Sequence, residues 1–393
     1  MTEKELRELA IGRHENGETP KAIYESLNKS KRWFFKWLKR FKSGDPNWSD
    51  ELSRKPHHSP KRTDPKMEQA IIEQRKNLEQ TLYAQIGVDN ISWQLSQKVN
   101  DLPSIATINR IIKRNDLTRK RPKYSSKGID YPSLEITKSN FLHQMDVVGP
   151  RYLKSDRRFY SVNIIDAFDR RALVNPKRRQ TRIEVTQSLI RAWQTLGIPT
   201  YLQLDNTLVN LGSHLYPHSF GVVIRLCLKL GIQPLFIPMS EPWRNGIVER
   251  FNNVFDKSFF RAQFFKNFRY LCEQAKNFED FHIYNHRYST MQGQTPIQRV
   301  SKGLKRLSKN FILPKKLTIA DGFVHFIRFI RSNRVLDLNG EKFPMPMSVV
   351  YEYVWATIDT EQERLFVYHD KKLIKEFDYS LPKTSLDLSK IEL

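Results

Sequence analysis

The chain has 393 residues, 39% of them hydrophobic and 12% aromatic, so it is long enough for about two to four packed domains. Its 66 Lys and Arg against 42 Asp and Glu give a formal net charge of +24, which favours binding to a polyanion such as nucleic acid. A basic surface that serves only solubility, or one of ribosomal type, is the alternative. The two cysteines, Cys227 and Cys272, form no CxxC pair, which argues against a disulfide framework and a cysteine-based zinc site.

The amino-terminal residues are charged and have no apolar core of a secretory signal. No apolar run approaches the roughly 18 residues that a membrane helix requires. We therefore expect a soluble, intracellular protein with no membrane partner.

Residues 1–47 are predicted to form a helix-turn-helix DNA-binding domain. Leu6 and Leu9 share one helical face, Gly17 breaks the chain, and Thr19-Pro20 starts a second helix. A third helix after Ser30 mixes aromatic with basic residues, as recognition helices do. The candidate DNA contacts on it are Lys31, Arg32, Lys36 and Arg40. A plain three-helix core with a solvated basic face is the alternative.

Residues 48–63 are polar, contain two prolines and are predicted to be a linker, with Arg54 and Lys55 as candidate DNA contacts. Residues 64–118 are predicted to form a second helix-turn-helix domain, whose last helix opens at Pro103-Ser104. The candidate DNA contacts there are Ser104, Thr107, Arg110, Lys113 and Arg114. Two such domains in tandem would contact a duplex at two places. Residues 119–135 form a basic linker.

The hydrophobic pattern then changes to one typical of strands, and residues 136–302 are predicted to form an α/β domain. Five strands are expected at residues 141–148, 158–167, 171–175, 200–204 and 232–237, and helices at 181–196, 217–230 and 245–260. Three neighbouring strands followed by alternating helix and strand indicate a mixed five-stranded sheet covered by helices.

Three acidic residues stand at the ends of apolar runs in this domain. Asp146 ends the first strand run, Asp205 follows the fourth strand, and Glu249 lies in the first turns of the last helix. Such positions allow the three carboxylates to meet at one end of the sheet. Two hard cations about 4 Å apart, held by carboxylate oxygens, would then support phosphodiester chemistry, with Asp146 as the bridging ligand. Taken singly, each residue is better explained as an ordinary cap or solvated residue, and Asp166, interpreted as a turn or structural residue, is the best substitute.

Polar residues next to these carboxylates are further candidates for contact with DNA. Asn206 directly follows Asp205, and the residues around Glu249 are Arg244, Asn245 and Arg250. They could orient substrate or contact phosphates.

Asp146, Asp205-Asn206 and the phrase from Pro242 to Asn252 resemble the DDE core of the retroviral integrase superfamily, and bacterial insertion-sequence transposases in particular. The likeness extends to the tandem helix-turn-helix domains, to Tyr284-Asn285-x-Arg287 and to Thr295-Pro296. Asp205 and Glu249 are 44 positions apart, more than is usual in the family, and residues 208–218 are expected to form an extra loop.

The resemblance implies a ribonuclease H-like core that uses Mg²⁺ or Mn²⁺, with two ions per active site. It also implies 3′-end cleavage of element DNA, strand transfer, and DNA partners that comprise terminal repeats and target. The resemblance further implies at least a dimer on DNA, a possible helper ATPase, and a cytoplasmic location at the bacterial nucleoid. The rivals are an inactive DNA-binding regulator derived from a transposase and a nuclease that cleaves without joining.

Three remaining features have mainly structural interpretations. His282 and His286 are one helical turn apart without a following Glu in metalloprotease register, which favours a structural or DNA-facing pair over zinc. The aromatic series from Phe259 to Phe278 is expected to pack in a core or between domains, with a subunit contact as the alternative. Residues 315–393 alternate as short strands and predict a small β-barrel, with Arg328 and Arg331 as candidate DNA contacts, or a stability domain.

Overall fold

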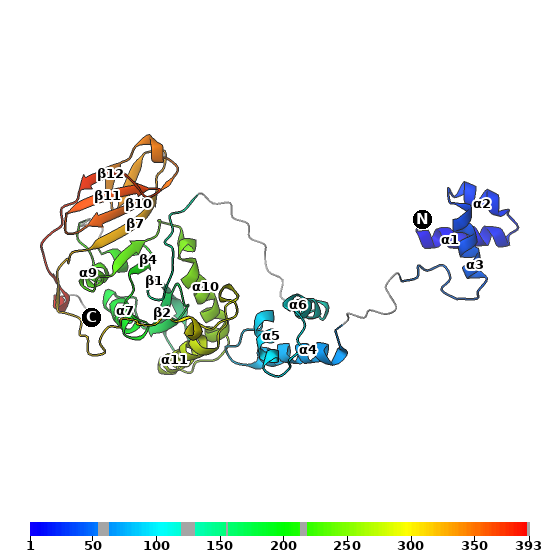
Figure 1. The fold of residues 1–393 in the computed structure, drawn as a ribbon, viewed down its shortest axis with the longest axis horizontal. Helices are drawn as coiled ribbons and strands as arrows, with labels where there is room; N and C mark the ends of the chain where they lie inside the picture. The colour runs from blue at the N-terminus through cyan, green and yellow to red at the C-terminus, as the bar shows by residue number, and fades with distance from the viewer. Residues whose placement is uncertain (54–62, 119–129, 155, 213–217, 391–393) are drawn as a thin grey trace. The chain divides into compact units, whose positions relative to one another are not determined.

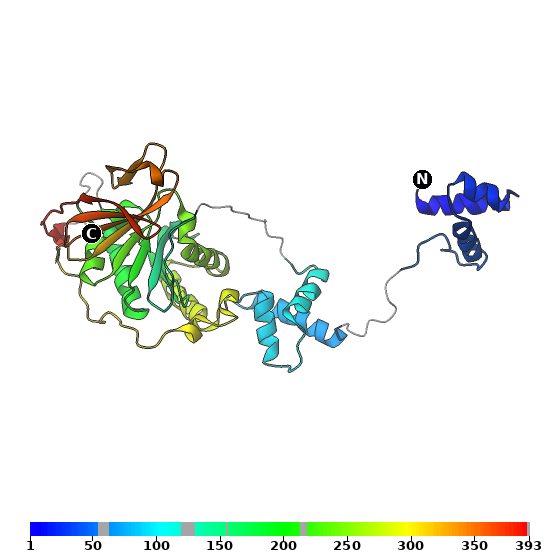
Figure 2. The same cartoon turned by 45° about the horizontal axis from the view of Figure 1, so that its top comes forward.

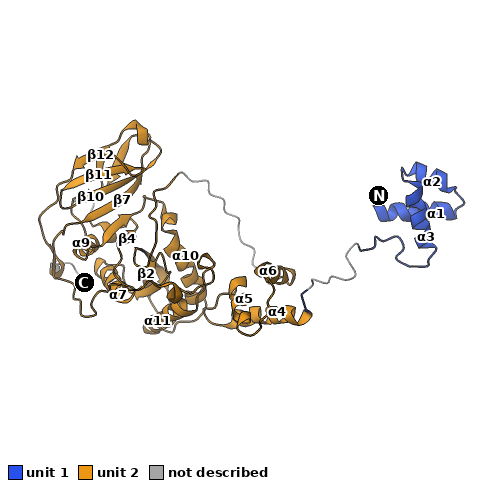
Figure 3. Ribbon diagram, in the orientation of Figure 1, with its two compact units in different colours: residues 1–64 blue, residues 65–393 orange. Residues whose placement is uncertain are grey.

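The computed structural model describes residues 1–53, 63–118, 130–154, 156–212 and 218–390 (Figure 1). The chain divides into two compact units, residues 1–64 and residues 65–393 (Figure 3). Within the described ranges, no helix combines the length and the apolar character that crossing a membrane requires.

The first unit is the three-helix domain predicted at the amino terminus. It consists of α1 (Glu3–Glu15), α2 (Pro20–Ser26) and α3 (Lys31–Phe41). A capping box of Thr2 and Glu5 starts α1, and the Ser30 hydroxyl accepts the Trp33 N–H at the start of α3. The packed unit continues past the predicted boundary, because Trp48 packs edge-on against Phe41 at 5.2 Å. The linker predicted from residue 48 therefore starts too early.

The second unit begins with another three-helix module, α4 (Pro65–Gln80), α5 (Val88–Ser96) and α6 (Ile105–Arg114). Its core consists of apolar side chains at helical spacing: Ile71, Leu78, Ile91, Leu95, Ile108, Ile111 and Ile112. The three helices agree with the prediction for this segment, whereas its role as a second DNA reader stays a prediction.

The module packs onto the following domain through Tyr83. This side chain is buried against the aromatic rings of Phe259, Phe278 and Phe281, with ring centroids 5.5–6.1 Å apart. Gln85 adds a polar contact, since its side-chain amide donates to the Arg287 carbonyl at 2.6 Å. Phe259 and Phe278 of the aromatic series thus have the predicted packing role, whereas Phe264 is 61% exposed.

The centre of the second unit is a mixed sheet with helices on both faces. Its five core strands are β1 (Leu142–Tyr152), β2 (Arg158–Asp166), β3 (Ala172–Lys177), β4 (Tyr201–Leu204) and β5 (Gln233–Phe236). They lie in the order β5-β4-β1-β2-β3, with β1, β2 and β3 antiparallel and β1, β4 and β5 parallel. The five predicted strands and the mixed sheet are therefore present.

Alternation along the strands separates two hydrophobic layers. Ile164 and Leu173 face the layer of α7 (Arg182–Thr195) and α9 (Val222–Lys229), while Ile165 and Val174 face the layer of α10 (Gly246–Val254) and α11 (Phe268–Asn285). The remaining short helices are α8 (Leu208–Leu211), η1 (Pro242–Asn245), η2 (Phe255–Phe260), η3 (Ser289–Met291), η4 (Pro296–Arg299), η5 (Met347–Val349) and η6 (Leu388–Lys390). Of these, η2 is a π-helix that continues α10.

The carboxy-terminal strands extend the same sheet, so the prediction of a separate small β-barrel is wrong. β7 (Phe323–Phe329) pairs in parallel with β5, and β10 (Tyr353–Asp359), β11 (Arg364–His369) and β12 (Lys372–Asp378) follow it to make nine strands. Figure 2 shows these orange and red strands beside the green core strands. The shorter strands are β6 (Lys316–Leu317), β8 (Val335–Leu338), β9 (Glu341–Pro344) and β13 (Leu386–Asp387).

The end of the predicted basic linker is packed rather than free. Tyr131 and Leu134 pack against Leu235, Ile327 and Tyr353 on the sheet. Residues 119–129, the greater part of that predicted linker, lie outside the described residues.

Candidate active site

Asp146 lies on β1, and Asp205 directly follows β4, the parallel neighbour of β1. β1 pairs with β4 in the register Leu142–Tyr201 to Gln144–Gln203, and continuing it by two residues places Asp146 opposite Asp205. Parallel strands lie about 4.8 Å apart, so the two carboxylates leave the sheet side by side. The β-sheet itself thus brings these two predicted residues together.

Glu249 is brought to the same place by polar contacts at the start of α10. The Gln144 side-chain oxygen accepts the backbone N–H groups of Ile247 and Val248, both at 3.1 Å. Gln144 therefore satisfies two donors that every helix leaves open at its amino terminus. Because Gln144 is on β1, two residues before Asp146, this cap joins the helix of Glu249 to the strand of Asp146.

Asn245 makes a second join, between α10, β1 and β4. Its side chain is 3% exposed, donates to the Met145 carbonyl at 2.9 Å and accepts from the Gln203 amide at 3.2 Å. Gln203 lies two residues before Asp205, on the same face of β4. The helix is thus held to both strands that bear aspartates.

The sequence alone did not identify Gln144 and Gln203 as part of the site. The available signal was an amide side chain inside each apolar run, two positions before the acid. The partner of Gln144 could not be predicted, because the start of α10 lies 103 positions away in the chain.

Asp146 accepts two hydrogen bonds, and it is electrostatically coupled to the other two carboxylates. Its Oδ1 accepts the Val147 N–H at 2.9 Å, and its Oδ2 accepts the Asn252 amide at 2.7 Å. Burial raises the pKa of Asp146, and the negative charges of Asp205 and Glu249 raise it further. Burial also raises the pKa of Glu249. Asp205 and Glu249 therefore both lie within electrostatic reach of Asp146.

Asn252 is itself held by the neighbouring strand. Asn163 lies opposite Asp146 on β2 and donates to the Asn252 oxygen at 2.8 Å. The Ser161 hydroxyl in turn donates to Asn163 at 2.7 Å. This chain of contacts fixes the amide group that faces Asp146.

The donor set suits a hard divalent cation, since all three side chains offer carboxylate oxygens. Across the residues that the structure describes, no three His, Cys, Asp or Glu side chains already stand close enough together to hold a metal ion. Asp205 Oδ1 instead accepts the Thr207 hydroxyl at 2.9 Å and the Asn210 amide at 2.7 Å. The oxygens of Asp146 and Asp205 thus accept hydrogen bonds from protein donors.

Four of the predicted DNA contacts have structural roles instead. Asn245 and Arg328 are buried, at 3% and 5% exposure, so the prediction of contact with DNA is wrong for both. Asn206 donates to the Ile237 carbonyl at 2.6 Å and accepts from Arg328 at 2.7 Å. Arg244 lies 3.9 Å above the Tyr131 ring and pairs with Glu241. These side chains hold the loops after β4 and β5 in place.

The other predicted DNA contacts are mostly exposed. The exposed basic side chains are Lys31, Arg32, Lys36, Arg110, Lys113, Arg114, Arg250 and Arg331. Arg40 donates to the Asp50 carbonyl at 2.7 Å, Arg114 pairs with Glu68, and the Ser104 hydroxyl caps α6 by accepting the Thr107 N–H. Arg54 and Lys55 lie outside the described residues.

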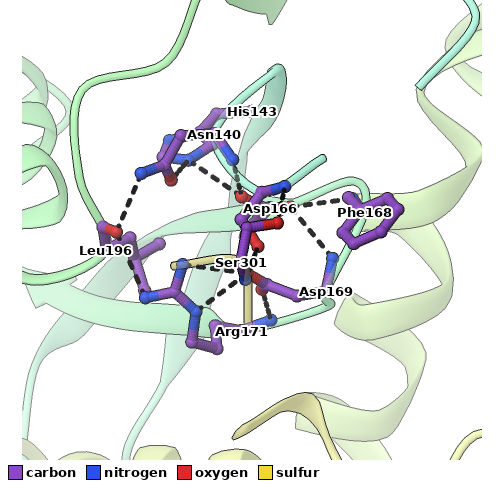
Figure 4. A network of polar contacts seen from close by, with 9 residues as sticks. Asn140, His143, Asp166, Phe168, Asp169, Arg171, Leu196 and Ser301 are labelled. Carbon is purple, nitrogen blue, oxygen red and sulfur yellow. Dashed lines mark hydrogen bonds and ion pairs between the residues drawn. The ribbon is translucent and has the colours of Figure 1, made fainter. Parts of the chain in front are cut away.

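Asp166 is a structural residue, as predicted, and belongs to a separate buried network (Figure 4). Asp166 lies opposite His143 in the β1–β2 pairing. Since His143 precedes Asp146 by three residues, Asp166 lies nearer the start of β1 than Asp146 does. Its Oδ1 accepts the N–H groups of Phe168 at 2.7 Å and Asp169 at 3.0 Å, which shapes the turn before β3.

The histidine pair also has a structural role. His282 is 1% exposed, and its Nε2 lies 2.8 Å from the Tyr288 hydroxyl. His286 is buried, and its Nε2 lies 3.0 Å from the Gln85 amide nitrogen. Burial lowers the pKa of both imidazoles, to about 4 for His286. The pair is thus neutral and packed, in agreement with the predicted structural role.

Comparisons with known proteins give matches to two parts of the chain. The HTLV-2 integrase catalytic core domain in complex with magnesium matches at 20% identity, over 41% of this chain and 97% of that one, with a TM-score of 0.31. The simian T-cell lymphotropic virus intasome in complex with PP2A regulatory subunit B56 gamma matches at 15% identity, over 72% and 92%, with a TM-score of 0.36. The BIV integrase catalytic core domain matches at 15% identity, over 40% and 92%, with a TM-score of 0.31.

No curated protein matches the chain. A family model matches at the amino terminus, over residues 1–48, and describes a homeodomain-like domain. This range contains α1, α2 and α3. Residues 1–48 thus match a homeodomain-like domain, the class of DNA-binding helical module that the sequence predicts there.

Proposed function

We propose that this protein is a DNA transposase of the DDE type, which binds element ends, cleaves their 3′ ends and joins them to target DNA. The observation that carries the proposal is the matched register of Asp146 and Asp205, with Glu249 held beside them by Gln144 and Asn245. Three carboxylates gathered from two strands and a helix have no evident role in stability, because like charges repel. Metal-dependent cleavage and joining of DNA would account for that arrangement.

Asp146, Asp205 and Glu249 would hold divalent metal, Mg²⁺ or Mn²⁺, with two ions per active site. Bound there, the metal would activate the attacking oxygen and stabilise charge on the transferring phosphoryl group. The raised pKa of Asp146 supports this assignment, since a cation would offset the repulsion that raises it. For Asp205 to bind metal, its carboxylate would have to exchange the hydrogen bonds of Thr207 and Asn210 for the cation.

The chain's own residues would set the geometry of this reaction. Asn252 and the Val147 N–H would each hold one oxygen of Asp146, and Asn245 would keep the first turn of α10 against both strands. Fixed carboxylates reduce the reorganisation that accompanies charge development in the transition state.

DNA binding by the amino-terminal domain would bring element ends to this site. The homeodomain-like match at residues 1–48 and the net charge of +24 support that role. The module of α4, α5 and α6 would act as a second reader. We also propose at least a dimer on DNA, because two ends must be cut together, and leave a helper ATPase as a possible partner.

The test incubates the purified full chain with candidate element ends, Mg²⁺ and a target plasmid, and sequences the products. Junctions between end and target are expected for the wild type. Asp146→Asn should bind the ends with similar affinity but give no junctions. Nicked ends without junctions would favour a nuclease, and binding without either product would favour an inactive regulator.

A further inference from the structure

Arg328, on β7, joins the carboxy-terminal strands to the segments that follow β4 and β5. Its side chain is 5% exposed, and its guanidinium donates four hydrogen bonds. The acceptors are the Asn206 side-chain oxygen at 2.7 Å and the carbonyls of Ile237 at 3.0 Å, Ile327 at 2.9 Å and Asp337 at 3.2 Å. Two of them, Asn206 and Ile237, lie 122 and 91 positions from Arg328 in the chain.

Ile237 holds the backbone on both sides of Asp205. Its N–H donates to the Leu204 carbonyl at 3.1 Å, and its carbonyl accepts the Asn206 amide at 2.6 Å. Arg328 donates to that same carbonyl and to the side chain of Asn206. Asp205 stands between the two bonded residues, so these hydrogen bonds restrict its position. Arg328 thus reaches the neighbourhood of Asp205 through measured contacts.

Tyr353, on β10, makes a similar contact with the loop that leads into α10. Its hydroxyl donates to the Glu241 carboxylate at 2.8 Å and accepts from the Arg244 guanidinium at 3.1 Å. The Arg244 carbonyl in turn accepts the Gln203 amide of β4 at 3.0 Å. The carboxy-terminal strands therefore also hold the loop that precedes the helix of Glu249.

The buried charge of Arg328 indicates a role beyond stability. Its four acceptors are neutral oxygens, and burial lowers the pKa of the guanidinium to about 10. A cation buried among neutral acceptors is costly, and apolar side chains often replace buried ionic groups without loss of stability. An apolar side chain could fill this space, but it could not hold Asn206 and Ile237 in one arrangement.

We infer that β7 and β10 complete the candidate active site, with Arg328 as a positioning residue for Asp205 and Tyr353 as one for the helix of Glu249. Residues that orient metal ligands in this way raise the affinity for the metal, because the ligands lose less freedom when the cation binds. The inference rests on the proposed function for the metal and the reaction.

Hydrogen exchange of the free protein, followed by mass spectrometry, tests the contact itself. Arg328→Lys and Asn206→Ala should each speed exchange in residues 204–212 by about ten-fold, since the lost hydrogen bonds ease local opening. Exchange in β2 should not change. Arg364→Lys is the matched control, because Arg364 lies on β11 of the same sheet and pairs with Glu376. Unchanged exchange in both variants, or equal acceleration in the control, would overturn the inference.

A Mg²⁺ titration of strand transfer tests the effect on the site. Asn206→Ala, Arg328→Lys and Tyr353→Phe should each raise the Mg²⁺ concentration for half-maximal activity by about ten-fold. Tyr351→Phe should not, since that ring is 60% exposed. A purely structural role would lower the melting temperature and leave this concentration unchanged, which would contradict the inference.

A double variant tests whether Arg328 acts through Asn206. Arg328→Lys combined with Asn206→Ala should raise the required Mg²⁺ by much less than the roughly hundred-fold expected of independent effects. A full hundred-fold increase would contradict the assigned path. If Arg328→Lys fails to fold, Asn206→Ala and Tyr353→Phe still decide the outcome. Failure of the proposed function is distinguishable, because the wild type would then form no junctions while the exchange of residues 204–212 still responded to the substitutions.

Discussion

The side-chain amide of Asn252 donates to Asp146 at 2.7 Å and joins the helix of one candidate ligand to the strand of another. Contacts of this kind orient metal ligands, and their loss typically reduces metal affinity or activity by 10- to 100-fold. Asn252 therefore has the position of a residue that acts through Asp146.

Asn252→Ala should lower strand-transfer activity by about 10- to 100-fold. It should also raise the Mg²⁺ concentration needed for half-maximal activity, because Asp146 would no longer be held. A Mg²⁺ titration of product formation measures both effects. Asn253→Ala is the matched control, since that exposed side chain donates to its own helix at Glu249. An equal loss in both variants would contradict the assigned role.

Glu249→Gln should abolish activity, by at least about a hundred-fold, yet stabilise the protein without metal. Burial raises the pKa of Glu249, so the ionised carboxylate is disfavoured by folding. The folded state then binds its proton more tightly than the unfolded state, and this destabilisation is complete above the raised pKa and absent below the unfolded value. The variant should melt higher than the wild type at pH 7, and the difference should vanish at low pH. A difference that grows on acidification would reverse the assigned sign.

Gln144→Ala should destabilise the protein by about 1–2 kcal/mol, because two N–H groups at the start of α10 lose their acceptor. Activity should fall as well, since the helix that carries Glu249 would no longer be tied to β1. Chemical denaturation gives the first effect and a strand-transfer assay the second. Gln97→Ala provides the control, as Gln97 is exposed beyond α5. Full activity in Gln144→Ala would show that the cap does not position the helix.

Tyr83→Ala should cost about 3 kcal/mol and loosen the second helical module from the rest of its unit. The ring is buried in the aromatic cluster of Phe259 and Phe278, whereas the neighbouring Leu82 is 46% exposed. Limited proteolysis after residue 80 should therefore become faster in Tyr83→Ala and stay unchanged in Leu82→Ala. Equal cleavage rates in both variants would indicate that the module is not held by this contact.

The five core strands were predictable because each is a short apolar run bounded by turn residues. Asp146 and Asp205 stand at the ends of such runs, so their place at one end of the sheet could also be expected from the sequence. The roles of Asn206 and Arg328 were not predictable. Each looks like a free polar side chain in the sequence, yet they bond to each other across 122 positions. Local pattern carries no information about such distant partners.

The carboxy-terminal strands show the same limit. Alternation and turn residues predicted short strands there, and strands are present. Whether those strands close on themselves or join another sheet depends on whether a free strand edge is available. β5 has such an edge at Leu235 and Phe236, which pair with β7. Unpaired strand edges attract further strands, which accounts for the nine-stranded sheet in place of a barrel.

The β5–β7 pairing bears on how the molecule can be divided. A chain that ended before Phe323 would lack β7, so the backbone groups of β5 that face β7 would lose their partners. The apolar side chains that pack against Val324, Phe326 and Ile327 would become exposed. Bare strand edges beside exposed apolar surface are what drives proteins to aggregate. The region that follows residue 315 is consequently a structural part of the strands that bear the aspartates, and only preparations that retain it should stay in solution.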